Sequence, residues 1–254
     1  MHKRAVQIGI TGQSGFIGKH LAALLSEEPD EFEIVPFHSA YFRDTAALED
    51  FVLQCDVIVH SACMNRHPDL QFLYDCNIEL TERLIGAMQT AGMRPDIIYT
   101  SSIRETEDGL YGKAKRESRV RLSRWAEENH CGFQGWVIPN VFGPGAKPYY
   151  NSFIATFCHQ LLSGQKPVVT ENREIPLLYV TNLCRSFRQA IRTSRGSFSS
   201  DKRKVVEPDF RMTVADVLGI LTRFREEYEI TGKVEPPADP NLCRLRDTFV
   251  GYLK

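Results

Sequence analysis

Near its start the sequence reads Thr11-Gly12-Gln13-Ser14-Gly15-Phe16-Ile17-Gly18. An alternating apolar and polar run at residues 5–10 precedes this stretch, and a helical pattern at residues 20–25 follows it. In a strand, loop and helix of this kind the first glycine permits a tight turn, the second lets a phosphate approach the backbone, and the third lets the helix pack on its strand. The pattern predicts a dinucleotide site at the helix N-terminus, where free N–H groups favour phosphate. The predicted cofactor contacts are Gly12, Gly15, Phe16, Ile17 and Gly18.

Further apolar segments alternate with helical patterns along the chain. The apolar segments cover residues 32–37, 57–62, 97–99 and 135–138, and the helical patterns cover residues 45–53, 73–91 and 113–128. This alternation predicts an α/β fold of the Rossmann type, a doubly wound parallel sheet with helices on both faces. Ligands bind such sheets at the carboxyl ends of the strands, where Ser61, Ala62 and Pro139 join the predicted cofactor contacts.

The local composition of the sequence changes after Asn140. A loop rich in glycine and proline at residues 141–148 predicts the exit from the regular sheet. The remaining patterns predict a helix at 152–162, a strand at 166–170, a helix at 182–192, a helix at 214–224 capped by Thr213, a linker at 235–240 and a last helix at 242–253. We therefore expect a cofactor-binding domain at residues 1–140 and a smaller C-terminal substrate-binding lobe at residues 141–254, partly interleaved with it.

Composition narrows the class of protein. The chain has 254 residues, 43% of them hydrophobic and 25% charged, which suffices for a large buried core. Its formal net charge of -1 gives no attraction to nucleic acid or to a membrane surface, and the basic residues 202–204 are expected in a solvated loop. No apolar run reaches the length of a membrane span. Seven cysteines without a Cys-x-x-Cys pair predict reduced thiols, a cytoplasmic location and no metal site.

A second group of residues carries chemistry. Tyr111 and Lys115 are four residues apart in a helical pattern, so both face the same side of the helix. A phenol donates protons near neutral pH when its pKa of about 10 is lowered, and a neighbouring ammonium group has this effect. Ser102 follows the apolar segment 97–99 and can hydrogen-bond the same substrate oxygen. Together with the glycine loop, Ser102, Tyr111 and Lys115 predict redox chemistry on a carbonyl or alcohol.

With these motifs the chain resembles the extended short-chain dehydrogenase/reductase superfamily, whose members include NAD-dependent epimerases and dehydratases. The resemblance rests on the glycine loop, residues 59–62, Ser102, the Tyr111 and Lys115 pair, and residues 140–144, all in the superfamily's order. More narrowly, residues 60–66, 139–143, 147–158 and 178–180 resemble the reductase domain of the capsule and O-antigen enzymes that make precursors of UDP-N-acetyl-L-fucosamine. That resemblance implies an NADPH-dependent reduction of a 4-keto-6-deoxy nucleotide sugar.

The resemblance stops short of those enzymes' full length. They carry a cupin domain after the reductase domain, and that domain epimerises the keto sugar before its reduction. The sequence ends at Lys254, about where the cupin domain would begin. A stand-alone reductase and a reductase without its second domain both stay open, and so do the identity and stereochemistry of the sugar.

The end of the second predicted strand bears on the choice of cofactor. Sites that prefer NAD usually carry a carboxylate there, about 20 residues beyond the glycines, to bind the ribose hydroxyls. This chain has Phe37-His38-Ser39 in that place, so no carboxylate repels a 2′-phosphate. His38 and the nearby Arg43 are candidates to contact that phosphate. We expect NADP as the cofactor, with NAD as the alternative.

Other reactions of the superfamily stay as alternatives. Dehydratases need a carboxylate pair directly after the position of Ser102, where this chain has Ile103-Arg104, and Glu105, Glu107 and Asp108 are expected to be solvated loop residues. Dehydration is therefore disfavoured. A nucleotide-sugar 4-epimerase with tightly bound NAD is the second interpretation. A non-catalytic NADP-sensing regulator is the third, although such proteins generally lose the tyrosine or the lysine, and both are present.

The remaining candidate residues concern the substrate and the assembly. Predicted substrate contacts, besides Ser102, are Asn140, Asn151, Lys147 and Arg173, the last two because cations suit the diphosphate oxygens. Asn77 resembles the superfamily's asparagine near the catalytic lysine, with a capping role as the alternative. Superfamily members commonly pair through two helices beside the sheet, so a homodimer through residues 113–128 is also expected. The predicted partner is a nucleotide sugar, with neither nucleic acid nor membrane involved.

Overall fold

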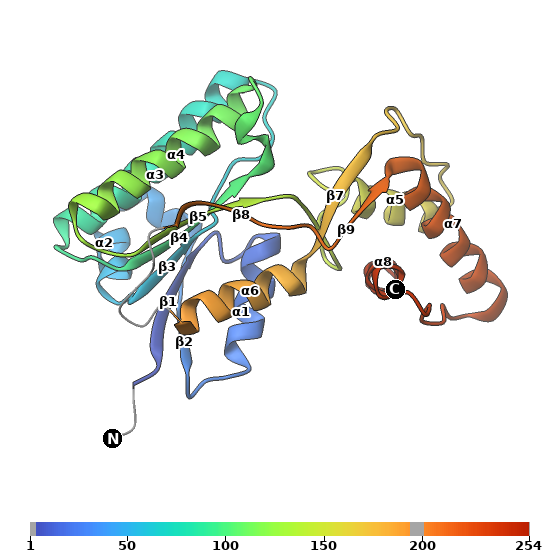
Figure 1. The fold of residues 1–254 in the computed structure, drawn as a ribbon, viewed down its shortest axis with the longest axis horizontal. Coiled ribbons are helices and arrows are strands. Elements are labelled where there is room, and N and C mark those ends of the chain that lie inside the picture. Colours follow the sequence, from blue (N-terminus) through green and yellow to red (C-terminus); the bar gives the residue numbers. More distant parts are fainter. Residues whose placement is uncertain (1–3, 194–200, 254) are drawn as a thin grey trace. The chain divides into compact units, whose positions relative to one another are not determined.

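The structure is a computed structural model that describes residues 4–193 and 201–253 (Figure 1). The chain divides into two compact units, the first made of residues 1–138 and 184–206, and the second of residues 139–183 and 207–254. Each unit has its own sheet. None of the helices in the described part of the chain combines the length and the apolar character needed to cross a bilayer.

The first unit contains a six-stranded, fully parallel sheet with the strand order β2-β1-β3-β4-β5-β8. Its strands are β1 (Val6–Thr11), β2 (Phe32–Val35), β3 (Val57–His60), β4 (Asp96–Ser102), β5 (Phe133–Ile138) and β8 (Asp201–Val205). The predicted doubly wound parallel fold is confirmed. Because the strand order reverses between β1 and β3, the loops that leave these two strands diverge and leave room for a ligand at the carboxyl edge.

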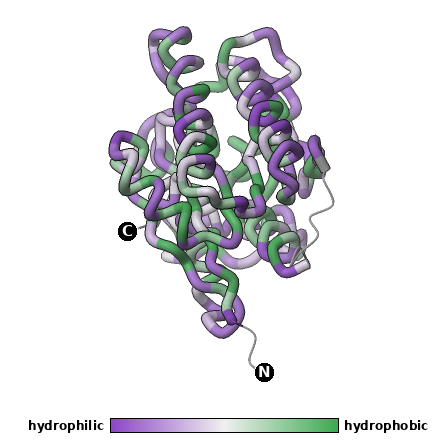
Figure 2. The backbone as a smooth tube through the Cα atoms, turned by 90° about the vertical axis from the view of Figure 1, so that its left-hand side faces the viewer, coloured by the Kyte–Doolittle hydropathy of each residue, from purple (hydrophilic) through white to green (hydrophobic). Residues whose placement is uncertain are grey.

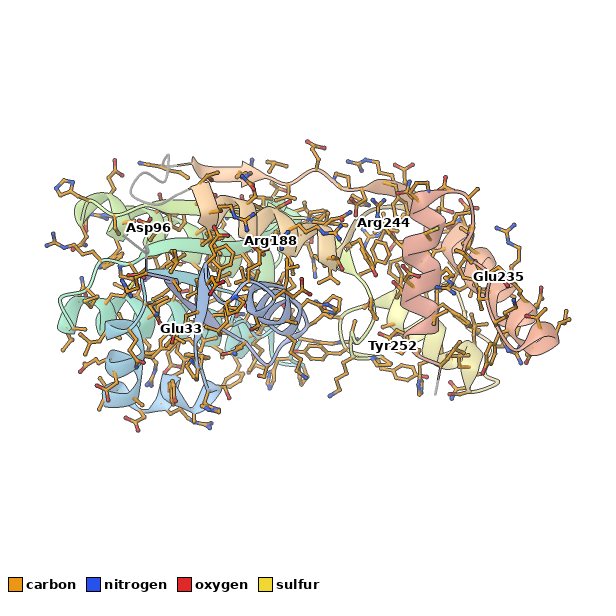
Figure 3. The ribbon with its side chains drawn as sticks, turned by 90° about the horizontal axis from the view of Figure 1, so that it is seen from below. Glu33, Asp96, Arg188, Glu235, Arg244 and Tyr252 are labelled. Atoms are coloured by element: carbon orange, nitrogen blue, oxygen red, sulfur yellow. The ribbon has the colours of Figure 1, made fainter. Side chains whose placement is uncertain are left out.

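Helices cover both faces of this sheet (Figure 1). One face carries α2 (Thr45–Leu53), α3 (Leu70–Thr90) and α4 (Leu110–Glu128), and the other carries α1 (Phe16–Ser26) and the C-terminal part of α6 (Val180–Thr193). On α6, Arg188 donates to Glu28 at 2.6 Å, an ion pair that fixes the helix beside the loop after α1 (Figure 3). Figure 2 shows hydrophilic and hydrophobic residues alternating along the helical turns, as amphipathic helices on a sheet require.

The two tryptophans lie in the core of the first unit. Trp125 of α4 and Trp136 of β5 are 3% and 1% exposed. The prediction of a solvated loop at residues 202–204 is wrong, because these residues form most of β8, which pairs with β5. Lys204 lies in register with Trp136 and places its ammonium 4.0 Å from the centre of the indole ring. The ammonium group itself lies over the indole ring, a cation–π contact that a composition argument does not reveal.

The second unit is built around a three-stranded sheet. Its strands are β6 (Asn140–Phe142), β7 (Glu174–Tyr179) and β9 (Phe210–Thr213), in the order β6-β7-β9. The helices α5 (Phe153–Leu162), α7 (Val214–Thr231) and α8 (Pro240–Val250) complete the unit. Thr213 caps α7 by accepting a hydrogen bond from the N–H of Asp216, so the predicted cap is confirmed.

The predicted strand at residues 166–170 is wrong, since these residues have no regular structure and Val168 is 71% exposed. The strand forms later, as β7, where Ile175, Leu177 and Leu178 are buried. Near the chain end, the hydroxyl of Tyr252 donates to the carbonyl oxygen of Ala146, which fastens the segment after α8 to the loop before α5 (Figure 3). The C-terminal segment is thus an integral part of the second unit.

Candidate active site

The glycine loop lies where the strand order reverses. Gly12 follows β1 with a φ of +76°, a conformation that glycine adopts without strain. A Cβ atom at this position would lie 2.9 Å from the backbone nitrogen of Ala62, in the loop after β3. The two loops therefore touch backbone to backbone. The structure brings the predicted cofactor contacts Gly12, Ser61 and Ala62 together at the carboxyl edge of the sheet.

The N-terminus of α1 is open toward this edge. Gly15 is its N-cap residue, and no side chain caps the helix, so the first turn, Phe16 to Gly18, keeps N–H groups for a ligand. A Cβ atom at Gly18 would overlap the carbonyl oxygen of Gly12, which explains the third glycine as the contact between helix and loop. These features fit a dinucleotide pyrophosphate, because they combine a cradle without side chains with an uncapped helix dipole.

Buried polar groups hold the ends of β1 and β3 together. The Ser61 hydroxyl donates to the carbonyl oxygen of Thr11 at 2.7 Å, and the Thr11 hydroxyl lies 2.7 Å from Nδ1 of His60. His60 is 1% exposed, and burial, assisted by the charge of Lys115, lowers the pKa of His60 to about 3. The imidazole is therefore neutral at physiological pH. The predicted site residue Ser61 thus has its hydroxyl engaged in the strand junction.

The end of β2 lies next to the glycine loop. The N–H of Phe37 donates to Oε1 of Gln13 at 3.0 Å, which ties the segment after β2 to the loop itself. His38 follows as the N-cap residue of the 3-10 helix η1 (Ser39–Arg43), and Arg43 is its last residue. Both predicted phosphate contacts, His38 and Arg43, are exposed. Their position at the carboxyl edge and their exposure leave both side chains accessible to a ligand.

Tyr111 and Lys115 lie one turn apart at the start of α4. The ammonium of Lys115 is 6.0 Å from the centre of the Tyr111 ring and 5.2 Å from that of Tyr99 in β4. Lys115 is 4% exposed and donates to the carbonyl oxygen of Thr100 at 2.9 Å. The Tyr111 hydroxyl donates to Oδ1 of Asn65 at 3.1 Å. The structure thus brings the predicted pair together, and the lysine is held by the strand that ends at Ser102.

The charge state of this pair follows from its burial. Burial raises the pKa of the Tyr111 phenol, Cys63 adds to the rise, and the Lys115 ammonium lowers the pKa without reversing the rise. The expectation that Lys115 brings the phenol below its ordinary value is therefore wrong for the protein without ligand. Burial alone would lower the pKa of Lys115, but Cys63, Tyr99 and Tyr111 outweigh it and hold the pKa above its ordinary value. At neutral pH the site contains a protonated phenol beside a charged ammonium group.

Ser102 ends β4 and begins the 3-10 helix η2 (Ile103–Thr106). Its hydroxyl oxygen accepts from the N–H of Arg104 at 3.2 Å. The guanidinium of Arg104 in turn lies 5.3 Å from the centre of the Tyr111 ring and pairs with Glu107 at 2.9 Å. Arg104 therefore connects Ser102 to Tyr111. Arg104 also stands at one of the two positions where a dehydratase is expected to carry its carboxylate pair. Glu107 is half-exposed, as predicted.

The prediction that Glu105 is a solvated loop residue is wrong, because its side chain is only 2% exposed. Its carboxylate accepts from the Ser101 hydroxyl at 2.6 Å, from Nε of Arg119 at 2.9 Å and from Nε of Arg203 at 2.7 Å. Burial acts to raise the pKa of Glu105, but these hydrogen bonds outweigh burial and hold the pKa below its ordinary value. A charged carboxylate thus joins η2 to β4, α4 and β8. Its two cationic partners, Arg119 and Arg203, are 14 and 98 residues away in the sequence, which is why local patterning missed it.

The predicted substrate contacts lie in the second unit. Asn140 begins β6 and is exposed, whereas Pro139 directly before it is buried. Lys147 and Asn151 are exposed on the loop before α5, with the Lys147 ammonium 5.8 Å from the centre of the Tyr150 ring. Arg173, before β7, has an exposed side chain that pairs with Glu171 at 3.7 Å.

Sequence reasoning missed two residues beside Tyr111 and Lys115. Asn65 accepts the hydrogen bond of Tyr111, and Cys63 lies close enough to Tyr111 and Lys115 to raise the pKa of both. Both follow β3, within the 60–66 stretch that carried part of the family resemblance, but no spacing rule joins them to a tyrosine 46 residues later. Among residues 4–193 and 201–253, no group of three or more His, Cys, Asp or Glu side chains is placed to hold a metal ion.

Comparisons with known proteins agree with this geometry. A reductase of Pseudomonas aeruginosa, UDP-2-acetamido-2,6-beta-L-arabino-hexul-4-ose reductase, is 32% identical over 222 residues, which are 87% of this chain and 58% of the relative. The crystal structure of the capsular polysaccharide assembling protein CapF from Staphylococcus aureus superposes with a TM-score of 0.81 at 27% identity, covering 98% of this chain and 65% of CapF. The chain therefore spans less than two thirds of the length of these two relatives.

The fold recurs in more distant structures. RMD from Pseudomonas aeruginosa, solved with NADPH, has a TM-score of 0.80 at 17% identity and covers 97% of this chain and 98% of that one. At this identity the likeness concerns the fold. The sequence profile described as "NAD dependent epimerase/dehydratase family" matches residues 8–201, which include the glycine loop, Ser102, Tyr111 and Lys115. The chain belongs to the NAD dependent epimerase/dehydratase family.

Proposed function

We propose that this chain is an NADPH-dependent reductase of a 4-keto-6-deoxy nucleotide sugar in sugar-nucleotide or polysaccharide biosynthesis. The observation that carries the proposal is that Tyr111 and Lys115 lie one turn apart on α4, with the ammonium 6.0 Å from the centre of the tyrosine ring, in the unit that also contains the glycine loop. The phenol is protonated and the ammonium is charged. A reduction needs a protonated acid at the start of the reaction, because the developing alkoxide takes its proton from it. The 32% identity to a reductase of a UDP-keto sugar supports the same reaction class.

In this proposal the first unit is the cofactor-binding domain. The first turn of α1 and the glycines hold the pyrophosphate, and the loop after β3 borders the nicotinamide half. His38 and Arg43 contact the 2′-phosphate of NADP, since both are exposed at the end of β2 and no carboxylate stands there to repel it. NADPH, when bound, supplies the hydride. Lys115 is placed to hold the nicotinamide ribose, because its ammonium is fixed beside Tyr111 by the carbonyl oxygen of Thr100.

The acid is Tyr111, whose hydroxyl proton passes to the ketone oxygen as negative charge develops there. Ser102 donates a hydrogen bond to that oxygen, and the Lys115 ammonium stabilises the phenolate that remains. Lys115 also offsets part of the burial effect on the Tyr111 pKa, so its loss makes phenolate formation harder still. The site lacks the carboxylate pair that dehydration needs, because Arg104 and not a carboxylate lies over the Tyr111 ring.

The second unit is proposed to bind the nucleotide sugar. Its exposed Lys147 and Arg173 offer cations for the diphosphate, and Asn140 and Asn151 offer amides for sugar hydroxyls. A cytoplasmic location is part of the proposal, supported by seven free cysteines. A homodimer through α4 is a further part, supported by the exposed Val120 on that helix.

The proposal is tested by following the loss of NADPH absorbance with a panel of UDP-, dTDP- and GDP-linked 4-keto-6-deoxy sugars. We expect turnover with one nucleotide class, a reduced sugar identified by mass spectrometry, and a loss in turnover of about 100- to 10,000-fold in the Tyr111→Phe variant. Incubation of the protein with NAD and UDP-N-acetylglucosamine is the matched test of dehydration, and we expect no 4-keto product. Tight NADP binding without turnover of any sugar in the panel contradicts the reductase.

A further inference from the structure

The Tyr111 hydroxyl is held by a residue that belongs to a different part of the sheet edge. It donates to Oδ1 of Asn65 at 3.1 Å, in a partly buried contact that joins α4 to the loop after β3. An amide oxygen accepts hydrogen bonds and has no proton to give, so this contact requires the phenol to be the donor. The side chain of Asn65 thus selects one orientation and one protonation state of the proposed acid.

The loop that carries Asn65 is fixed by an asparagine of α3. Asn77, 5% exposed, accepts from the N–H of Met64 at 2.9 Å and donates to the carbonyl oxygen of Met64 at 2.9 Å. A third bond, from Asn77 to the carbonyl oxygen of Leu73, holds the side chain of Asn77 itself at 2.8 Å. Met64 is therefore held by both polar groups of its backbone. Its two neighbours are Cys63 and Asn65, and both contact the catalytic pair.

This arrangement has a chemical consequence for the phenol. A hydrogen-bond acceptor that meets the neutral phenol stabilises it against ionisation, as burial does. The ketone oxygen of a substrate is an acceptor of the same kind as the asparagine oxygen. A substrate that enters can therefore replace Asn65 as the acceptor, and the proton that Asn65 held in place is then directed at the ketone.

On the basis of the proposed reductase function, we infer that Asn65 is a positioning residue for Tyr111, and that its amide oxygen keeps the phenol oriented until the substrate's ketone oxygen replaces it. Asn77 acts one step further out, because it fixes the backbone on which Asn65 stands. The positioning role of Asn65 differs from the role of Ser102, which hydrogen-bonds the substrate oxygen. It also differs from the role of Lys115, whose ammonium charge stabilises the phenolate.

Two substitutions of Asn65 should shift the pKa of the Tyr111 phenol in opposite directions. Asn65→Ala removes the acceptor, and because the protonated phenol of the free enzyme loses this stabilisation, the alkaline limb of the kcat/KM profile moves down by about half to one pH unit. Asn65→Asp keeps an acceptor and adds a negative charge, so the same limb moves up. We expect kcat of Asn65→Ala to fall about tenfold with KM within about twofold, since proton delivery is disturbed more than binding. The control Asn129→Ala, at the far end of α4, leaves the limb in place.

A second measurement is independent of any sugar. With tyrosine labelled at Cζ with ¹³C, the Tyr111 signal is assigned by its absence in Tyr111→Phe, and its chemical shift at neutral pH reports the hydrogen bond at the hydroxyl. We expect Asn65→Ala to move this signal and Asn129→Ala to leave it unchanged. If the wild type reduces none of the sugars, the proposed function fails, and the shift alone decides the inference. An unmoved Tyr111 signal in Asn65→Ala, or equal limb shifts in both Asn65 variants, overturns the positioning role.

Discussion

A Cβ atom at Gly112 would overlap the carbonyl oxygen of Arg104, so the first turn of α4 packs against η2 without a side chain between them. Gly112 directly follows Tyr111, and Arg104 is the residue whose guanidinium lies over the Tyr111 ring. The glycine between Tyr111 and Lys115 therefore has a steric reason: it lets the segment after Ser102 approach the helix that carries the proposed acid.

Replacing Gly112 tests this packing. Gly112→Ala forces η2 and α4 apart, and we expect a loss of about 1 to 3 kcal/mol in the free energy of unfolding, together with a fall in turnover. Urea denaturation measures the first effect. The matched control is Gly86→Ala in α3, where an added Cβ atom meets nothing within 4 Å. There the gain in helix propensity should stabilise the protein by up to about 1 kcal/mol. Equal effects of the two substitutions would contradict the steric argument.

Tyr111→Phe removes the phenolic proton and leaves the ring in place. We expect an intact fold, unchanged NADPH binding and a loss in turnover of about 100- to 10,000-fold, the range for general acid catalysis. Lys115→Met should lose turnover to a similar extent and also weaken cofactor binding, because its ammonium has two proposed partners. Steady-state kinetics and a cofactor titration separate the two variants. A Tyr111→Phe protein that keeps more than about a tenth of wild-type turnover would disprove the assignment of the acid.

Glu105 should make stability depend on pH in the acid range. The pKa of Glu105 is held below its ordinary value in the folded protein, so its stabilising contribution is complete above the unfolded-state value of about 4 and is lost as the pH falls through the folded-state value. Glu105→Gln leaves the buried guanidinium of Arg119 without its counter-charge, and we expect a cost of about 3 to 5 kcal/mol at neutral pH.

Denaturation at several pH values checks this prediction. The difference in unfolding free energy between wild type and Glu105→Gln should narrow on acidification. The control is Glu107→Gln, because the half-exposed pair of Glu107 with Arg104 contributes within about 1 kcal/mol. A difference that stays constant down to strongly acid pH would show that the Glu105 carboxylate is not charged in the fold.

The proposed NADP preference rests on two exposed residues. NADPH should bind more tightly than NADH in a fluorescence titration, and His38→Ala and Arg43→Ala should each weaken NADPH binding by up to about tenfold without changing NADH binding. The selectivity should decline with salt, since exposed charges are screened. Equal affinities of the wild type for NADPH and NADH would contradict the proposed roles of His38 and Arg43.

The sequence predicts the first unit well because its signals are local. Gly18 serves a contact within the strand, loop and helix in which it stands, and the apolar runs of β3 and β4 are buried on both faces. Tyr111 and Lys115 share one helix face, so their spacing suffices to place them together. In these cases the pattern and the contact lie within one element or between neighbours in the chain.

The missed features depend on partners far along the chain. β7 contains Pro176, which normally argues against a central strand, yet Ile175 and Leu177 on either side are buried in the second unit. β8 consists largely of charged residues. Arg203 pairs with Glu105, which lies 98 residues away in the sequence, and Lys204 covers Trp136. Asn65 has no local signal either, because its role arises where the loop after β3 meets Tyr111 on α4. Periodicity cannot report such contacts.

The chain passes between the two units three times, after Ile138, after Leu183 and after Val206. The second of these points lies inside α6, a continuous helix of 14 residues. Neither unit is therefore a contiguous piece of gene, and one recombination event cannot exchange the second unit, the proposed substrate-binding part, for that of another family member. A chimera with new sugar specificity needs two grafted segments, residues 139–183 and 207–254, and one of its junctions must restore the helical register within α6.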